Sequence, residues 1–167
     1  ARGGFTRNPY VLDYDPCGSS SGSAVALAAN LCALAVGTET DGSILAPSHA
    51  NSTFGLKPTV GRVPGAGIIP IAHSQDTAGP ITRSVTDTAI MLNVLKTPFG
   101  PVAGHALPSD YTAFLQRGAL QGARIGVDRR QFEPDYFALP EINAVVERAI
   151  EVMADLGATI VDPVDTG

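Results

Sequence analysis

Two clusters of small, hydroxyl-bearing residues flank an apolar stretch of the chain. The first is CGSSSGS at residues 17–23, and the second is TDGS at residues 40–43. Hydrolysis of an amide needs a nucleophile, a group that carries a proton to the leaving nitrogen, and N–H donors for the tetrahedral oxyanion. The second cluster offers the hydroxyl of Ser43 as the nucleophile. A tight turn there also presents consecutive backbone N–H groups, those of Thr40, Asp41, Gly42 and Ser43.

A different hydrolase pattern overlaps the first cluster. Gly18, Ser20 and Gly22 satisfy G-x-S-x-G, the nucleophile elbow of α/β-hydrolases, in which Ser20 would be the nucleophile. The elbow directly follows a strand, whereas Pro16 lies two residues before Gly18, and proline disfavours a central strand. The three histidines show no spacing that singles out a catalytic partner; they are His49, His73 and His105. The elbow is therefore disfavoured.

A phosphate-binding P-loop is also disfavoured for the first cluster. That loop requires G-K-[ST] after its glycines, and no lysine occurs before Lys57. A Gly and Ser loop that opens a helix can still bind an anion through its backbone N–H groups. A module that only binds a ligand therefore remains an alternative, as does a simple flexible turn.

The elements that hold the clusters in place follow from the apolar pattern between them. Ser23 is expected to cap a helix from Ala24 to about Leu31, and the near absence of a polar face predicts burial on all sides. The following segment, CALAVGT at residues 32–38, predicts a short buried strand that ends at Gly37. A buried helix and strand would then connect the two clusters.

The chain divides into three zones. Residues 1–97 hold both serine clusters, residues 98–122 form a connecting segment, and residues 123–167 form a strand–helix–strand segment of the same domain. SVTD at residues 84–87 is a capping-box pattern that begins a helix. In the third zone a helix with one apolar and one charged face ends near Gly157. A strand–helix–strand unit favours an α/β architecture with a right-handed crossover.

Composition excludes several classes of protein. The 167 residues are 44% hydrophobic, enough for one globular, soluble domain with a core. A net charge of −5 without a basic cluster argues against nucleic acid or an anionic membrane as partner. No membrane span or signal-peptide core is visible in the sequence. Cys17 and Cys32, with the histidines, form no zinc or disulfide pattern, so we expect no metal or cofactor, and the compartment stays open.

The two clusters and the segments after them resemble the amidase signature family of serine hydrolases. The matching segments are GSSSGS at 18–23, GTETDGSILAPS at 37–48, FGLKPTVGRVP at 54–64 and HSQDTAGPITRSVTD at 73–87. They occur in the family's order, and they are most similar to the peptide amidase branch, which releases ammonia from C-terminally amidated peptides. The resemblance implies an α/β fold in which a mixed β-sheet is covered by helices on both faces, with this chain supplying part of it.

The resemblance also implies a catalytic triad of Ser, cis-Ser and Lys. Ser43 falls on the nucleophile, and Ser19 falls on the bridging serine, whose peptide bond is cis and whose hydroxyl relays the proton. Ser20 and Thr38 match positions whose hydroxyls support this network. The backbone N–H groups from Thr40 to Ser43 match the oxyanion hole.

The chain departs from the family pattern in three places. The family's catalytic lysine lies upstream of the bridging serine, whereas Lys57 and Lys96 both lie downstream. We therefore expect the 167-residue chain to be a central piece of a longer fold and to be nearly inactive by itself. Asp41 stands where many members have Gly, and we expect only its N–H to face the site. Leu45 replaces a commoner Arg, which suits neutral chain ends better than free carboxylates.

The predicted function is hydrolysis of a carboxamide, such as a C-terminal peptide amide, through an acyl-enzyme on Ser43. Two alternatives stay open: an amidotransferase A-type subunit, which passes ammonia to a partner, and a catalytically incomplete paralogue that only binds. The expected partners are a small-molecule or peptide amide and the remaining segments of the same fold. Asp76 and Thr77 are expected to fix a turn beside the site rather than to perform chemistry.

Overall fold

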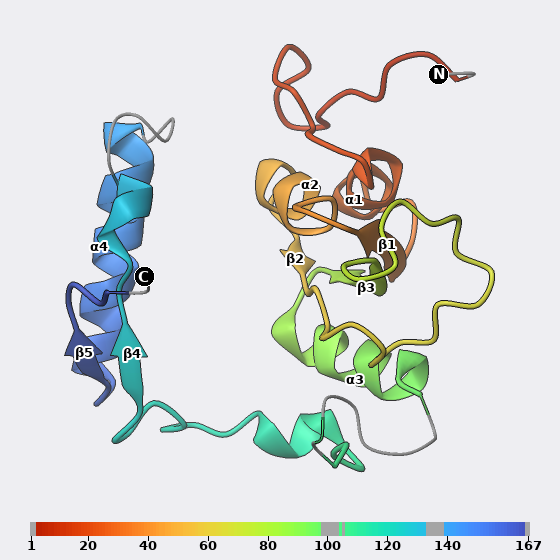
Figure 1. The fold of residues 1–167 in the computed structure, drawn as a ribbon. Coiled ribbons are helices and arrows are strands. Elements are labelled where there is room, and N and C mark those ends of the chain that lie inside the picture. Colours follow the sequence, from red (N-terminus) through yellow and green to blue (C-terminus); the bar gives the residue numbers. More distant parts are fainter. Residues whose placement is uncertain (1–2, 98–103, 105, 133–138, 166–167) are drawn as a thin grey trace. The chain divides into compact units, whose positions relative to one another are not determined.

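The computed structural model describes residues 3–97, 104, 106–132 and 139–165 (Figure 1). The contacts divide the chain into two compact units, which are described separately. Unit 1 comprises Ala1–Ala113, and unit 2 comprises Phe114–Gly167. Among the helices of the described residues, none combines the length and the apolar character that crossing a membrane requires.

Unit 1 contains a three-stranded antiparallel sheet in the order β1-β3-β2. The strands are β1 (Ala35–Glu39), β2 (Phe54–Gly55) and β3 (Thr77–Thr82). The register pairs Ala35 with Ile81 and Glu39 with Thr77, and β2 pairs with the other edge of β3. Every residue of β3 is buried, as expected for a central strand with both faces covered.

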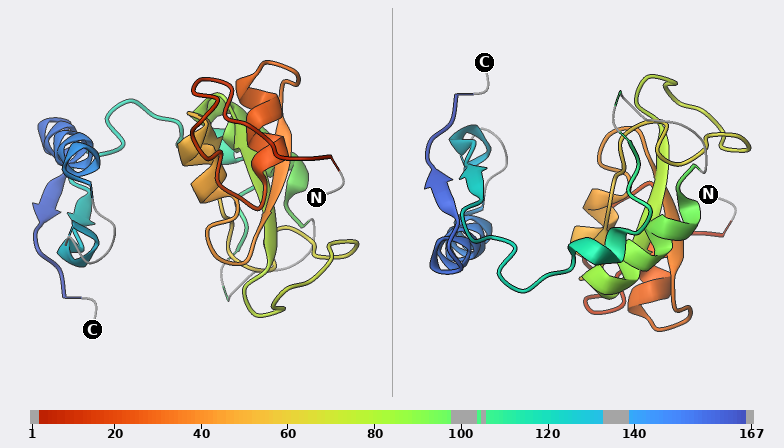
Figure 2. Two further views of the ribbon diagram at one scale, coloured as in Figure 1. Left: turned by 90° about the horizontal axis from the view of Figure 1, so that it is seen from above. Right: turned by 90° about the horizontal axis from the view of Figure 1, so that it is seen from below.

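Helices cover both faces of this sheet. Figure 1 shows α1 (Ser21–Ala28) and α2 (Leu45–Ala50) on one side and α3 (Val85–Leu95) on the other, and the two views of Figure 2 show the same sheet from above and below. Successive side chains of a strand point to opposite faces. Ile81 accordingly packs with Ala24, Leu27 and Ile44, all four fully buried. Ala78 packs with Val63 and Leu92 of α3.

The helix between the serine clusters begins earlier than the sequence predicts. It starts at Ser21, so Ser23 lies inside it, and the Ser23 hydroxyl donates to the carbonyl oxygen of Val36 at 2.8 Å instead of capping. Only Ala24 and Leu27 of this helix are buried. The predicted cap and the predicted burial on all sides are therefore wrong for the described chain, because a tertiary contact to β1 uses the serine that looked like a cap.

The strand after this helix continues past the glycine at which it was expected to end. It runs to Glu39, and Gly37 lies within it. A Cβ at Gly37 would lie 2.9 Å from the Ile81 side chain and 2.9 Å from the Ser20 hydroxyl oxygen. Glycine here allows a close approach of β1 to its neighbours rather than ending the strand.

The predicted cap at Ser84 is confirmed, but the Asp87 carboxylate accepts from the Ser84 hydroxyl, at 2.8 Å, in place of the Ser84 N–H of a complete capping box. The Ser84 hydroxyl oxygen accepts a hydrogen bond from the Asp87 N–H at 3.0 Å, and α3 begins at the next residue, Val85. After α3, residues Tyr111–Phe114 form a 3-10 turn. Local sequence signals therefore placed this part of unit 1 correctly.

Unit 2 contains the predicted strand, helix and strand. These are β4 (Arg124–Gly126), α4 (Pro140–Asp155) and β5 (Thr159–Val161), with a 3-10 turn at Arg129–Phe132 between β4 and α4. β4 and β5 pair in parallel. Gly157, with φ +95°, follows the end of α4. Antiparallel and parallel pairs thus occur together with helices, which confirms the α/β class.

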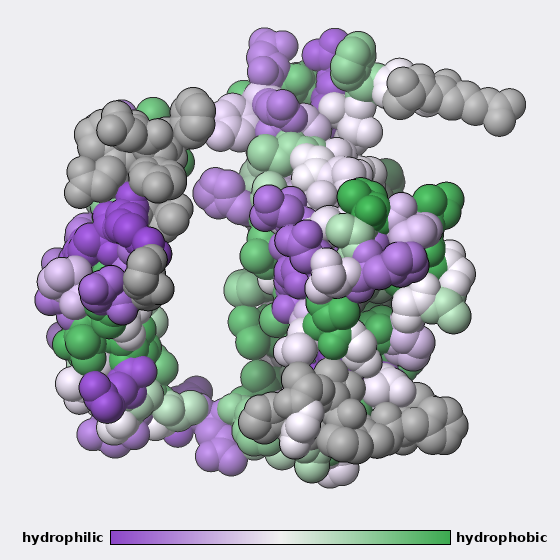
Figure 3. Space-filling view, viewed as in Figure 1, coloured by the Kyte–Doolittle hydropathy of each residue, from purple (hydrophilic) through white to green (hydrophobic). Residues whose placement is uncertain are grey.

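The described residues of α4 include none that is buried. Val145 on its apolar face is 71% exposed. Figure 3 shows apolar residues, in green, reaching the surface of both units between hydrophilic ones. The apolar periodicity of α4 therefore predicted the helix but not a buried face within this chain.

Candidate active site

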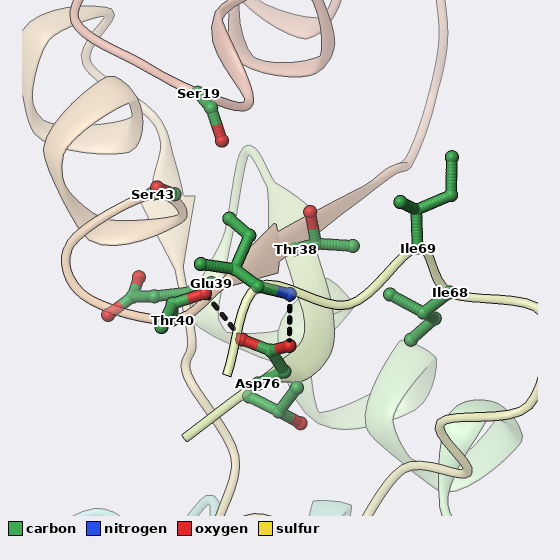
Figure 4. A pocket seen from close by; sticks show the side chains of 10 residues that line it. Ser19, Thr38, Glu39, Thr40, Ser43, Ile68, Ile69 and Asp76 are labelled. Atoms are coloured by element: carbon green, nitrogen blue, oxygen red, sulfur yellow. Dashed lines mark hydrogen bonds between the residues drawn. The ribbon is translucent and has the colours of Figure 1, made fainter. Parts of the chain in front are cut away.

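A small pocket brings together residues from both serine clusters and from the segment before β3 (Figure 4). Ser19 from the first cluster and Ser43 from the second both line it. The other lining residues are Thr38, Glu39, Thr40, Ile68, Ile69, Ile71, Asp76 and Thr77. Two hydroxyls that the sequence placed far apart thus face one cavity.

The backbone around Ser19 has the geometry that the resemblance implied, because the peptide bond between Gly18 and Ser19 is cis. The segment before it is fixed from two sides. The N–H of Cys17 donates to a carboxylate oxygen of Asp15 at 2.8 Å, and the side-chain amide of Asn51 donates to the Pro16 carbonyl at 2.9 Å. These contacts hold the first cluster where Ser19 reaches the pocket.

Asn51 connects the two clusters through α2. Its side-chain amide also donates to the carbonyl oxygen of Pro47 at 2.7 Å, one turn earlier on the helix that follows Ser43. The side chain is completely buried. Sequence reasoning missed this residue, because its partner Pro16 lies 35 positions away.

Ser20 links the first cluster to β1 and to Ser43. Its hydroxyl donates to the carbonyl oxygen of Thr38 and accepts from the Thr38 N–H, both at 3.1 Å. The Ser20 N–H donates to the carbonyl oxygen of Ser43 at 3.2 Å. The Ser20 hydroxyl thus contacts the backbone of Thr38 rather than its hydroxyl. Since the Ser20 hydroxyl is engaged with β1, its geometry does not match a nucleophile elbow.

The loop that carries Ser43 lies between β1 and α2. Gly42 has φ +77°, a conformation that favours glycine, and its carbonyl oxygen accepts from the Ala46 N–H at 2.7 Å. Within the described part of the chain, no residue accepts a hydrogen bond from the backbone N–H groups of Asp41, Gly42 or Ser43. The Asp41 side chain is exposed and does not line the pocket. The turn therefore has donors to offer an incoming oxyanion.

Glu39 holds the start of α2, a role that sequence reasoning missed. This residue is only 4% exposed, and one of its carboxylate oxygens accepts from the Ile44 N–H at 2.7 Å and the Leu45 N–H at 2.9 Å. Buried carboxylates require such partners. No local signal in the sequence marks Glu39, because its role depends on its burial at the end of β1.

Asp76 fixes a turn beside the pocket, as predicted, and also contacts the Ser43 loop. One carboxylate oxygen accepts from the N–H groups of Ile71 and Ala72 at 2.7 and 2.9 Å. The other accepts from the Thr40 hydroxyl at 2.5 Å. The Thr40 hydrogen bond is the main reason that the pKa of Asp76 lies below its usual value. The side-chain link to Thr40 was not predicted.

The other candidate residues that the structure describes do not line this pocket. His49 is an exposed residue in the last turn of α2, His73 lines a neighbouring pocket together with Asp76, and His105 lies outside the described residues. Neither Lys57 nor Lys96 lines the pocket, and the Lys96 ammonium donates to the Pro108 and Ser109 carbonyls. Among the described residues, no group of three or more His, Cys, Asp or Glu side chains is arranged to hold a metal ion.

Comparison with known proteins decides the family. A family model described as Amidase matches residues 1–166. The chain belongs to the amidase signature family. This amidase segment is 45% identical over 134 residues to a probable amidase of Arabidopsis thaliana, covering 76% of this chain and 26% of that protein. It is 40% identical over 168 residues to the A-type subunit of a glutamyl-tRNA(Gln) amidotransferase from Acinetobacter baumannii, covering 95% of this chain and 32% of that protein.

Solved structures give the same result. The native peptide amidase from Stenotrophomonas maltophilia matches the amidase segment with a TM-score of 0.84 and 46% identity, over 98% of this chain and 34% of that chain. A structure of a peptide amidase in complex with the competitive inhibitor chymostatin matches with a TM-score of 0.81 and 45% identity, over 93% of this chain and 32% of that chain. The chain therefore spans about a third of the length of these relatives, and the fold of this part of the family is confirmed.

Proposed function

We propose that the protein containing this chain hydrolyses a carboxamide and releases ammonia, with a C-terminal peptide amide as the substrate. The observation that carries this proposal is that Ser19 and Ser43 line one pocket in a member of the amidase signature family. The unengaged N–H groups of the Ser43 turn support it, because acyl transfer needs such donors beside the nucleophile.

The proposed reaction begins when the Ser43 hydroxyl attacks the amide carbonyl carbon. Its proton passes through the Ser19 hydroxyl to a lysine that is not present in this chain. The backbone N–H groups from Thr40 to Ser43 donate to the oxyanion of the tetrahedral intermediate. The C–N bond then breaks, the leaving amide nitrogen takes a proton and departs as ammonia, and water hydrolyses the acyl-enzyme that remains on Ser43.

The hydrogen bonds around the pocket suit this assignment. Glu39 holds the N–H groups that directly follow Ser43, and Ser20 connects the Ser43 carbonyl with β1. In the proposed reaction these groups position the nucleophile and contact no substrate. A reacting hydroxyl held in place in this way loses less orientational freedom in the transition state.

The substrate class rests on two further observations. Leu45 stands where the family more commonly has Arg, so a substrate carboxylate near the scissile amide would gain no ion pair from this position. The peptide amidase structures are among the matches with the highest sequence identity, at 45–46%. A neutral amide at the end of a peptide is consistent with the lack of a cation at Leu45 and with the similarity to the peptide amidases.

A second candidate function is supported by the amidotransferase relative. At 40% identity over 95% of this chain, it is nearly as similar as the amidases. In that case the amide would be that of glutamine, and the ammonia would pass to a partner. A catalytically incomplete paralogue that only binds is the third possibility, and it requires that the whole protein lack the lysine.

Ammonia release by the whole protein separates these functions. We expect turnover of a C-terminal peptide amide, a loss of at least about 10³-fold in Ser43→Ala, and unchanged turnover in Ser109→Ala, a control at an exposed serine outside the pocket. Turnover of glutamine alone would support the amidotransferase function. Turnover of neither amide would contradict both the amidase and the amidotransferase function. The 167-residue chain by itself is expected to be nearly inactive.

A further inference from the structure

The Asp76 carboxylate is the point at which two walls of the pocket meet. One wall is the turn from Thr40 to Ser43, and the other is the apolar segment that contributes Ile68, Ile69 and Ile71. Asp76 accepts from the Thr40 hydroxyl with one oxygen and from the N–H groups of Ile71 and Ala72 with the other. In Figure 4 two dashed lines reach the two oxygens of the Asp76 carboxylate, one of them from the labelled Thr40. The other line is the hydrogen bond from the Ile71 N–H.

The hydrogen bonds that the two Asp76 oxygens accept are those that an ionised carboxylate makes. An ionised carboxylate only accepts hydrogen bonds, and all three of its partners here are donors. The lowered pKa of Asp76 keeps the group in that form, and His73 adds a smaller favourable charge interaction. The carboxylate therefore joins two segments that share no other side-chain hydrogen bond among the described residues.

We propose that Asp76 is a positioning residue that holds the apolar segment Ile68–Ile71 across from Ser43, so that the site prefers amides whose acyl part carries an apolar group. This inference rests on the proposed function. An acyl group bound to Ser43 lies in the same pocket as the three isoleucines, and apolar contact there strengthens binding of an apolar group while adding little for a glycine. The hydrogen bond to Thr40 keeps this wall at a fixed distance from the nucleophile.

Four variants separate the effect of the Thr40–Asp76 hydrogen bond from the effect of the turn at Ile71 and Ala72. Thr40→Val removes only the bond between the two walls, and Thr40→Ser restores the hydroxyl. Asp76→Ala removes all three bonds, whereas in Asp76→Asn the amide can donate to the Thr40 oxygen while its carbonyl keeps the turn. Asp110→Ala is the matched control, because Asp110 also accepts from a threonine hydroxyl and a backbone N–H and also has a lowered pKa, but it does not line the pocket.

The test compares peptide amides that end in leucine amide and in glycine amide, using the whole protein. Thr40→Val and Asp76→Ala are expected to raise KM for the leucine amide by about tenfold relative to KM for the glycine amide. Thr40→Ser and Asp76→Asn are expected to restore most of the preference for the leucine amide, and Asp110→Ala, outside the pocket, is expected to stay within about threefold of the parent protein for both amides. Equal effects on the two amides, or no effect of Thr40→Val, would overturn the proposal.

A second readout keeps this inference distinct from the proposed function. If the parent protein turns over no amide, the proposed function fails. Hydrogen exchange then tests the link alone: the Ile71 and Ala72 amides are expected to be protected in the parent protein and in Asp110→Ala, and to exchange faster in Asp76→Ala. Unchanged exchange in Asp76→Ala would overturn the positioning role whether or not the protein is active.

Discussion

The two units of this chain use their polar side chains in different ways. In unit 1 the polar groups Asn8, Glu39 and Asn51 are buried, and each contacts the backbone of another segment. In unit 2 the main polar cluster is Arg129 with Glu147 and Asp162, and all three side chains are partly exposed. Buried polar contacts tolerate few substitutions, whereas exposed ion pairs contribute little to stability. We therefore predict that substitutions in unit 1 lower the free energy of unfolding more than substitutions in unit 2 do.

The largest expected difference concerns the apolar core. Leu27 is fully buried against the sheet of unit 1. We expect Leu27→Ala to lower the free energy of unfolding of this chain by about 2–5 kcal/mol. Val145→Ala, at an exposed position of α4, is expected to change it by less than about 0.5 kcal/mol. Urea unfolding measures both. A comparable loss for Val145→Ala would contradict this difference between the units, because it would show that the Val145 side chain is buried in the folded chain.

The next effect concerns the buried carboxylate of unit 1. Glu39→Ala leaves two N–H groups at the start of α2 without their acceptor, and we expect a loss of about 2–4 kcal/mol in the free energy of unfolding. Glu39→Gln keeps an oxygen that both N–H groups can reach, so we expect a loss of only about 1 kcal/mol. Equal losses in the two variants would contradict the contacts described for this oxygen.

A smaller effect is expected at the cap of α3. Ser84→Ala removes the acceptor for the Asp87 N–H and is expected to cost about 1 kcal/mol in the free energy of unfolding. Thr86→Ala, at an exposed position of the same helix, is the control and should be neutral or slightly stabilising. If Ser84→Ala matches this control in thermal or urea unfolding, the cap does not contribute to the stability of unit 1.

The smallest effect is a pH dependence in unit 2. The hydrogen bond from Arg129 lowers the pKa of Asp162, so the folded state favours the charged carboxylate. The resulting stabilisation is fully present above the usual Asp pKa of about 4 and is lost as the pH falls through the lowered pKa. Acid unfolding of the parent chain and of Asp162→Asn should therefore converge toward pH 2. A difference that grows on acidification would have the wrong sign.

The sequence predicted regular elements better than it predicted the contacts of the site. The strand–helix–strand order of unit 2 follows from periodicity, and the capping box follows from four neighbouring residues. Ser23 and Gly37 were misread because each looked like a local terminus, whereas each makes a contact with a distant segment. Local patterns contain no information about such partners.

In the candidate site, too, the sequence predicted local motifs better than contacts between distant residues. Ser19 and Ser43 were identified from motifs that match a family, and the structure places both in one pocket. The link from Thr40 to Asp76 spans 36 positions and the link from Asn51 to Pro16 spans 35, and neither lies in a shared motif. Glu39 was missed because its importance depends on its burial, which an acidic residue near a serine cluster does not suggest.

The most direct test of the central claim is covalent labelling of the whole protein with a fluorophosphonate, read by intact mass and by sequencing of the labelled peptide. We expect a single adduct on Ser43, and its loss in Ser43→Ala. An adduct on Ser20 or on another serine, or none on Ser43 in the folded whole protein, would contradict the assignment of Ser43 as the nucleophile.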